Sequence, residues 1–142
     1  MPRYVVDASV AAKWYFEEEH SGEAARLLTE DAFDLLAPDF IRLEVAATAW
    51  KRVVRGEIVP DKAEEILREL GNVPIDLVST TDLVSSALTI ALQVRRSVYD
   101  SVYLAHAIQS GAALLTGDRK FFDAIKAGPL AAHIAWIGDL PV

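Results

Sequence analysis

The sequence predicts an α/β protein, a three-layer α/β/α sandwich with a short, mostly parallel central sheet. Short apolar runs such as RYVVD alternate along the chain with longer segments of helical periodicity. Glycine, proline and capping residues separate these segments, and the chain has no internal repeat or low-complexity tract. Strands that alternate with helices form a parallel sheet covered on both faces. The 142 residues are expected to fold as one domain that covers residues 1–142.

The expected strands are short. The first run is rich in β-branched and aromatic residues, and Pro38 stops the second. The last run is expected at an edge of the sheet. The strands predicted in this way cover residues 3–7, 35–37, 74–79, 113–116 and 134–137.

Seven helices are expected around these strands, and several have clear start or stop signals. Asp39 is a favourable N-cap for the third helix, which Gly56 ends. Pro60 suits the first turn of the fourth helix. Ser79 and Asp82 have capping-box spacing at the start of the fifth helix. The predicted helices cover residues 8–16, 21–30, 40–55, 60–70, 79–93, 97–111 and 119–127.

The composition excludes several classes of protein. The chain has no cysteine, which removes disulfides, thiolate zinc sites and cysteine nucleophiles. No apolar run approaches the length of a membrane span, and the N-terminus lacks the layout of a signal peptide, so a cytoplasmic location is expected. The net charge of −7 argues against a broad nucleic-acid-binding surface. Clustered carboxylates that wait for divalent cations would also make the chain acidic, so a nuclease remains possible.

Four acidic residues occupy positions that differ from those of ordinary surface acids. Asp7 closes the first predicted strand, and Asp118 lies just past the fourth. In parallel sheets, ligands gather at the carboxyl ends of strands near a switch in strand order. Glu44 and Asp100 lie on otherwise apolar faces of two predicted helices, where an ionised carboxylate without a partner is costly. We therefore expect these four carboxylates to share one site.

Each of these acids also has a purely structural interpretation. Asp7 and Asp118 are favourable N-caps for the helices that follow them. Asp100 lies three residues after Ser97, as in a capping box. Glu44 is compatible with a structural ion pair. Capping and metal binding are not mutually exclusive, so both interpretations stay open for each residue taken alone.

The joint placement of the four acids favours a metal site. Four negative charges in one cleft repel one another unless a cation binds. Oxygen ligands of this kind suit Mg²⁺ or Mn²⁺. A bound metal lowers the pKa of a water molecule and stabilises negative charge on a phosphate, so phosphodiester hydrolysis is the chemistry that this donor set predicts. Ser9 and Thr116 place hydroxyl groups next to Asp7 and Asp118.

Other chemistries lack their usual sequence patterns. His20, His106 and His133 are scattered, and none has the spacing of a helical zinc-binding pair. The chain has no phosphate-binding glycine loop, which disfavours ATP or dinucleotide binding. It also lacks the Gly-x-Ser-x-Gly elbow of serine hydrolases.

The order of these motifs resembles that of a known family. VVDAS near the start, the acid in FIRLEVAATAW, then YDSVYLAHA and LLTGDRKFF are similar to the motifs of PIN-domain ribonucleases, and in particular of the short VapC-type toxins. The resemblance spans essentially the whole chain. By position, Asp7, Glu44, Asp100 and Asp118 match the acidic quartet of the family, and Ser9 and Thr116 match its supporting hydroxyls.

This resemblance implies an activity and partners. The family implies a Mg²⁺- or Mn²⁺-dependent endoribonuclease with an RNA substrate, inhibited by a cognate antitoxin protein and commonly homodimeric. Asp7 and Asp100 are expected to hold the metal directly, and Glu44 and Asp118 directly or through water. Arg119, Lys120 and the cluster of basic residues 51–55 are candidates to approach the RNA backbone, although cations at helix ends also favour the helix dipole.

Two alternatives to a toxin ribonuclease stay open. The first is a non-catalytic PIN-fold module that binds RNA or protein. The second is a nuclease or phosphatase that uses the same acids on DNA or small phosphate esters. Metal titration separates the first from an enzyme, and a comparison of substrates separates the second.

Overall fold

A computed structural model of the chain describes residues 2–141 and contains a five-stranded, entirely parallel sheet in the order β3-β2-β1-β4-β5. The predicted sandwich is therefore confirmed, and the expected edge strand is β5. Each predicted strand is present with an end shifted by a residue or so. The strands are β1 (Arg3–Val6), β2 (Asp34–Pro38), β3 (Ile75–Val78), β4 (Ala113–Thr116) and β5 (Ile134–Trp136).

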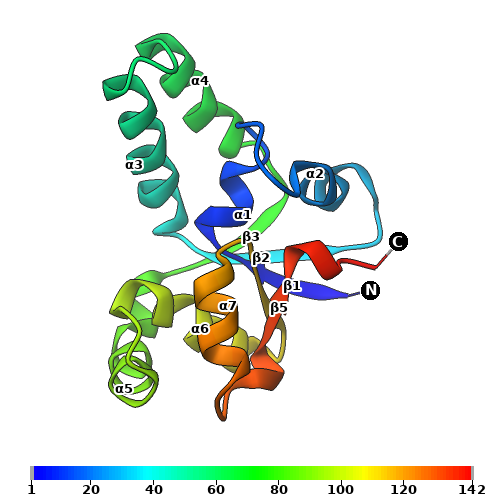
Figure 1. The fold of residues 1–142 in the computed structure, drawn as a ribbon, viewed down its shortest axis with the longest axis vertical. Helices are drawn as coiled ribbons and strands as arrows, with labels where there is room; N and C mark the ends of the chain where they lie inside the picture. Colours follow the sequence, from blue (N-terminus) through cyan, green and yellow to red (C-terminus); the bar gives the residue numbers. More distant parts are fainter. Residues whose placement is uncertain (1, 142) are drawn as a thin grey trace.

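The helices form two layers on opposite faces of the sheet. Figure 1 shows α1 to α4 above the sheet and α5 to α7 below it. Right-handed crossovers explain this division, because the chain moves from β1 to β3 in one direction across the sheet and from β4 to β5 in the other. The helices are α1 (Ala8–Ala12), α2 (Ser21–Thr29), α3 (Ile41–Val54), α4 (Pro60–Leu70), α5 (Val84–Val94), α6 (Val98–Ser110) and α7 (Arg119–Lys126).

Helix α6 lies at the centre of the core. Its residues from Ser101 to Ala107 are all buried, because α6 packs on β1, β2 and β4 while α5 packs on α6. A helix in such a position is apolar on most of its surface rather than on one stripe. Val5 and Val6 on β1 and Leu114 and Leu115 on β4 are all buried, because successive residues of these paired strands point to opposite faces of the sheet and both faces are covered by helices.

Helix α1 is shorter than the sequence predicts. The expected helix over residues 8–16 stops at Ala12, and the next residues form a turn. Lys13 donates from Nζ to the carbonyl oxygen of Glu19 at 2.7 Å, which closes this turn. The turn buries Phe16 and lets the indole of Trp14 donate to the carbonyl oxygen of Ala24, so tertiary contacts override the local helical pattern.

Two predicted caps are wrong. Asp39 does not cap α3, because its Oδ1 accepts from the amide nitrogen and the hydroxyl of Thr80 at 3.0 and 2.6 Å. It thereby ties the end of β2 to the segment after β3. Ser79 makes no side-chain cap hydrogen bond, and the capping box with Asp82 is not formed. Residues Thr80–Leu83 form a 3₁₀ turn instead, and α5 begins at Val84.

The strand order places a topological switch point at the carboxyl ends of β1 and β4. β1 lies between β2 and β4, and the chain direction across the sheet reverses at the β1–β4 pair. This is the switch point at which α/β proteins bind ligands. Asp7 directly follows β1, and Asp118 follows β4 after one glycine. No helix within residues 2–141 is long and apolar enough to cross a membrane.

Candidate active site

Asp7 is a buried carboxylate that caps α1. Its Oδ1 accepts from the amide nitrogen of Val10 at 3.2 Å and from the hydroxyl of Ser9. Only 5 % of the residue is exposed. Burial raises the pKa of Asp7 to about 6, against the lowering effect of its hydrogen bonds, and the charge of Asp100 adds to the rise. A cap alone does not require this burial, because N-caps function at the surface of proteins.

Asp118 caps α7 and is held beside Asp7 by two hydroxyl groups. Its Oδ1 accepts from the amide nitrogen of Phe121 at 3.1 Å, and its own amide donates to Thr116 Oγ1 at 3.1 Å. Thr116 Oγ1 lies 3.3 Å from Ser9 Oγ, which also accepts from the amide nitrogen of Gly117 at 2.8 Å. Ser9 and Thr116 therefore join the ends of β1 and β4.

Asp100 lies in the first turn of α6. Its amide nitrogen donates to Ser97 Oγ at 3.0 Å, so Ser97 is the N-cap and the carboxylate of Asp100 is left for other contacts. Arg96 donates from Nη2 to Asp100 Oδ2 at 3.0 Å. Burial raises the pKa of Asp100, the Arg96 guanidinium opposes the rise, and the charge of Asp118 adds to it.

Glu44 reaches the same region from α3. The hydroxyl of Tyr103 donates to Glu44 Oε1 at 2.6 Å, and the Tyr103 ring packs on Phe40 with ring centroids 5.0 Å apart. Burial raises the pKa of Glu44, the Tyr103 hydrogen bond lowers it, and the charge of Asp100 raises it. The same contact and burial raise the pKa of the Tyr103 hydroxyl. Glu44 thus bonds to a neutral donor, and the structural ion pair is not formed.

The four acids influence one another through Asp100. Its charge raises the pKa of both Asp7 and Glu44, and Asp118 raises the pKa of Asp100. The fold therefore brings four distant segments to one end of the sheet. Within residues 2–141, however, no three Asp, Glu or His side chains are arranged to hold a metal ion. Instead, each of the four carboxylates accepts a hydrogen bond from a donor of the chain itself, namely Ser9, Tyr103, Arg96 or the amide of Phe121.

Two groups of basic residues differ in their relation to this site. Arg119 and Lys120 begin α7 directly after Asp118. Arg119 stacks on Trp136, with 5.0 Å from Cζ to the ring centroid, and pairs with Asp123 at 3.2 Å. The basic cluster 51–55 lies in the last turns of α3, whereas Glu44 lies in the first. Arg52 in that cluster pairs with Glu18 at 2.8 Å, so it serves the fold.

Sequence reasoning missed Tyr103 and Arg96 as partners of the acids. Tyr103 follows Asp100 by three residues on α6, and Arg96 precedes Asp100 by four, just before the helix begins. A search for donors at this spacing would have found them. It would not have revealed that the Tyr103 hydroxyl bonds to Glu44, which is 59 positions away in the sequence.

The donor set defines the chemistry available to the site. It consists of four carboxylates and two hydroxyls, with no thiolate or imidazole among them. Oxygen donors of this kind bind hard divalent cations. Three of the carboxyl groups have raised pKa values because burial and neighbouring charge disfavour their ionised forms. A divalent cation would relieve that unfavourable charge.

Comparisons with known proteins give a consistent result. Residues 4–127 match the family model described as PIN domain. The chain is 35% identical over 127 residues to Ribonuclease VapC3 of Pyrobaculum aerophilum, a match that covers 88% of this chain and 96% of that protein. The fold of a solved structure, PAE2754 from Pyrobaculum aerophilum, is similar with a TM-score of 0.68 and 20% identity, covering 98% of this chain and 86% of the other.

Two further solved structures share this fold. A toxin–antitoxin complex from Klebsiella pneumoniae contains a chain with a TM-score of 0.65 and 14% identity, and the match covers 93% of this chain and 95% of that one. VapBC2 from Rickettsia felis, bound to a DNA fragment from its promoter, gives the same TM-score and identity over 94% and 98% of the two chains. At this level of identity the likeness concerns the fold.

Proposed function

The chain belongs to the PIN-domain family, and from this premise we propose that it is a VapC-type endoribonuclease, the toxin of a toxin–antitoxin pair. It hydrolyses phosphodiester bonds of RNA in a single domain that spans residues 1–142. A toxin that acts on cellular RNA works in the cytoplasm. The observation that supports the proposal is the mutual charge effect among Asp7, Glu44, Asp100 and Asp118, which come from the starts of α1, α3, α6 and α7.

The residues of the site fit a Mg²⁺ or Mn²⁺ ion by their chemistry. All four candidate ligands are carboxylates, and three of them carry raised pKa values in the absence of a compensating cation. We assign direct contact to Asp7 and Asp100, and contact directly or through water to Glu44 and Asp118. When bound, such a cation supplies an activated water molecule and stabilises negative charge on the phosphate.

The remaining side chains of the site hold these four carboxylates in place. Ser9 and the amide of Val10 fix Asp7, and the amide of Phe121 fixes Asp118. Tyr103 fixes Glu44 from a buried ring that is 2 % exposed. Ligands that are held by hydrogen bonds lose less conformational entropy when they meet a cation, so these contacts preorganise the site. Arg119 and Lys120 lie next to Asp118, where they are placed to contact the RNA backbone.

A substitution of Asp100 tests the proposed activity. Wild-type protein is expected to cleave RNA with Mg²⁺ or Mn²⁺ and to lose the activity in EDTA. Asp100→Asn should reduce cleavage by roughly a hundredfold or more, because the substitution removes a charged ligand of the cation. Asp123→Asn is the matched control, since Asp123 is an acid of the neighbouring helix α7 that pairs with Arg119 at 3.2 Å. Cleavage by Asp100→Asn at the wild-type rate would remove Asp100 from the mechanism.

The same assay separates the alternative functions. A non-catalytic PIN-fold module would show no carboxylate-dependent Mn²⁺ binding and no cleavage. A DNA-directed nuclease or a phosphatase would prefer single-stranded DNA or a small phosphate ester to RNA. We expect RNA to be the preferred substrate, in line with the name of the similar protein from Pyrobaculum aerophilum, Ribonuclease VapC3.

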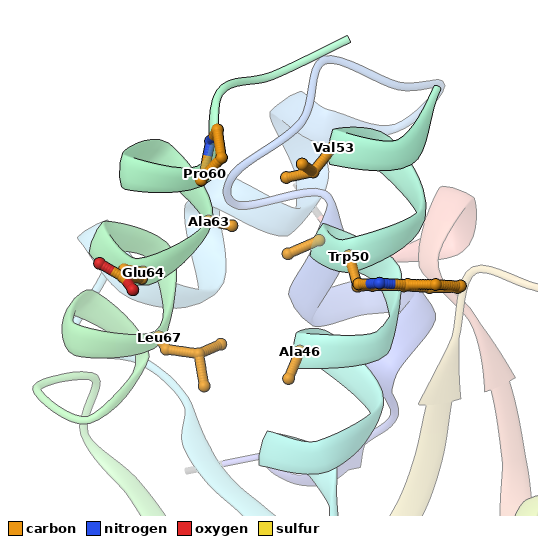
Figure 2. A pocket seen from close by; sticks show the side chains of 8 residues that line it. Ala46, Trp50, Val53, Pro60, Ala63, Glu64 and Leu67 are labelled. Atoms are coloured by element: carbon orange, nitrogen blue, oxygen red, sulfur yellow. The ribbon is translucent and has the colours of Figure 1, made fainter. Parts of the chain in front are cut away.

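We assign the antitoxin to an apolar groove between α3 and α4. The groove has a volume of about 300 Å³. Figure 2 shows Ala46, Val53 and Leu67 pointing into the space between the two helices, with the Trp50 ring extending away from α4. Trp50 is 63% exposed, which is unusual for so large an apolar side chain. Co-purification with the product of a small adjacent reading frame, and its loss in Leu67→Glu, would support this assignment.

Exposed apolar residues on α3 and α5 support a homodimer. On α5, Val84, Leu88 and Leu92 form one stripe at helical spacing, and Leu92 is 75% exposed. Figure 1 shows α3 at the upper left and α5 at the lower left of the view, and α3 adds the exposed apolar side chains of Leu43 and Val54. A surface of this kind marks an interface. Light scattering should give the mass of a dimer for the wild type and of a monomer for Leu88→Glu/Leu92→Glu.

A further inference from the structure

Arg96 is the basic residue that forms an ion pair with one of the four acids of the candidate site. Among the ion pairs that the structure describes, the pair of Arg96 with Asp100, at 3.0 Å, is the one that involves any of the four acids. The residue lies between α5 and α6, immediately before the N-cap Ser97. Arg95, which ends α5 with a φ of 57°, gives the chain the turn that brings Arg96 to this position.

The guanidinium of Arg96 connects two of the elements that carry the acids. It bonds to Asp100 on α6 and lies over the ring of Phe121 on α7, with 5.2 Å from Cζ to the ring centroid. The amide of Phe121 in turn binds Asp118. An arginine held over an aromatic ring keeps its charge at a fixed place.

The hydrogen bonding of Arg96 is incomplete. Its Nη2 donates to Asp100 Oδ2, whereas its Nε is buried and has no hydrogen-bond partner. Buried donors are normally satisfied, so the Nε of Arg96 has hydrogen-bonding capacity that the described residues do not use. The Arg96 side chain is 27% exposed, so part of the guanidinium faces solvent beside the four acids.

We propose that Arg96 sets the charge balance of the site, weakening its attraction for a divalent cation and strengthening its attraction for an RNA phosphate. This inference rests on the proposed function. Four carboxylates carry a formal charge of about −4 and a divalent cation neutralises half of it, so an incoming phosphate still meets net negative charge. A guanidinium at the same place attracts the phosphate and repels the cation.

These two effects have opposite signs, and that distinguishes a charge role from a structural one. If Arg96 only positioned Asp100, its removal would weaken cation binding and leave RNA affinity in EDTA, where no cation is bound, largely unchanged. If Arg96 balances charge, its removal strengthens cation binding and weakens RNA binding. The Coulomb energy of a divalent cation near a single charge in a largely aqueous site corresponds to roughly a threefold to tenfold change in affinity.

The experiment compares Arg96→Gln with two controls. Arg95→Gln removes the same charge from the preceding, exposed residue. Arg96→Lys keeps the positive charge and tests whether the charge alone is enough for wild-type Mn²⁺ and RNA affinity. Mn²⁺ affinity is measured by calorimetry without RNA. RNA affinity is measured in EDTA, by fluorescence polarisation of a short labelled single-stranded RNA of mixed sequence over a range of salt concentrations.

Arg96→Gln should bind Mn²⁺ roughly threefold to tenfold more tightly and RNA more weakly by a similar factor, with a salt slope smaller by about 0.7. Arg95→Gln should change Mn²⁺ affinity less than about twofold, and Arg96→Lys should match the wild type. Weaker binding of Mn²⁺ by Arg96→Gln, or Mn²⁺ affinity equal to that of Arg95→Gln, would overturn the inference. Wild-type protein that neither binds nor cleaves RNA would overturn the proposed function and the RNA half of the inference, while the Mn²⁺ titrations still decide the other half.

Discussion

The replacement of Asp7 by Asn is expected to make the protein more stable while it abolishes activity. Asp7 is 5 % exposed, and burial raises its pKa from 3.8 to about 6. A group whose pKa is raised in the folded state binds a proton that the unfolded chain has already released at the same pH. The unfolding free energy therefore falls as the pH rises from about 4 to about 6, and it stays lower at every higher pH.

The size of this effect follows from the two pKa values. The difference between 3.8 and about 6 corresponds to about 3 kcal/mol of unfolding free energy lost at neutral pH. Asn keeps an oxygen that accepts from Ser9 and Val10, but its amide group needs an acceptor and offsets about 1 kcal/mol. Asp7→Asn should then be about 2 kcal/mol more stable than the wild type near pH 7.5, or about 6 °C in Tm.

Urea unfolding in EDTA, followed by tryptophan fluorescence, measures this difference. Near pH 4 the gain in stability should vanish, because Asp7 is then protonated in the folded state and only about half ionised in the unfolded chain, so little stability is lost through its ionisation. Saturating Mn²⁺ should stabilise the wild type more than the variant, since the variant lacks a charged ligand. The reasoning is refuted if Asp7→Asn is less stable than the wild type near pH 7.5 while wild-type stability stays constant between about pH 4 and 6.

Two other substitutions test how the site is held. Tyr103→Phe removes the donor to Glu44 Oε1, so the pKa of Glu44 should rise. Mn²⁺ affinity, measured by calorimetry, should fall by roughly fivefold because Glu44 is no longer held in place. Unchanged affinity would show that Tyr103 does not position Glu44. Gly117→Ala should lower the unfolding free energy by about 1–2 kcal/mol. A Cβ at Gly117 would lie 2.5 Å from Cε of Lys13, which the bond to Glu19 holds in place. Gly22→Ala, where nothing lies within 4 Å, is the neutral control, and equal stability of the two variants would contradict this explanation.

Much of the fold was predictable because its signals are local. Short apolar runs predicted all five strands, and Pro60, Ser97 and Gly111 mark helix ends at the positions that the structure shows. Where the prediction was wrong, a contact between distant segments had replaced a local one. Asp39 bonds to Thr80 rather than to its own helix, and Lys13 closes a turn in place of another helical turn.

The four acids of the candidate site were predicted from the sequence alone. Burial cost and position at strand ends are properties of single residues and their neighbours, so the four acids were predictable from them. Only the tertiary structure decided how each acid is held. The bond from Tyr103 to Glu44 and the place of Arg96 between Asp100 and Phe121 depend on how α3, α6 and α7 pack. The strength of such contacts varies with distance in space, and a sequence does not contain that distance.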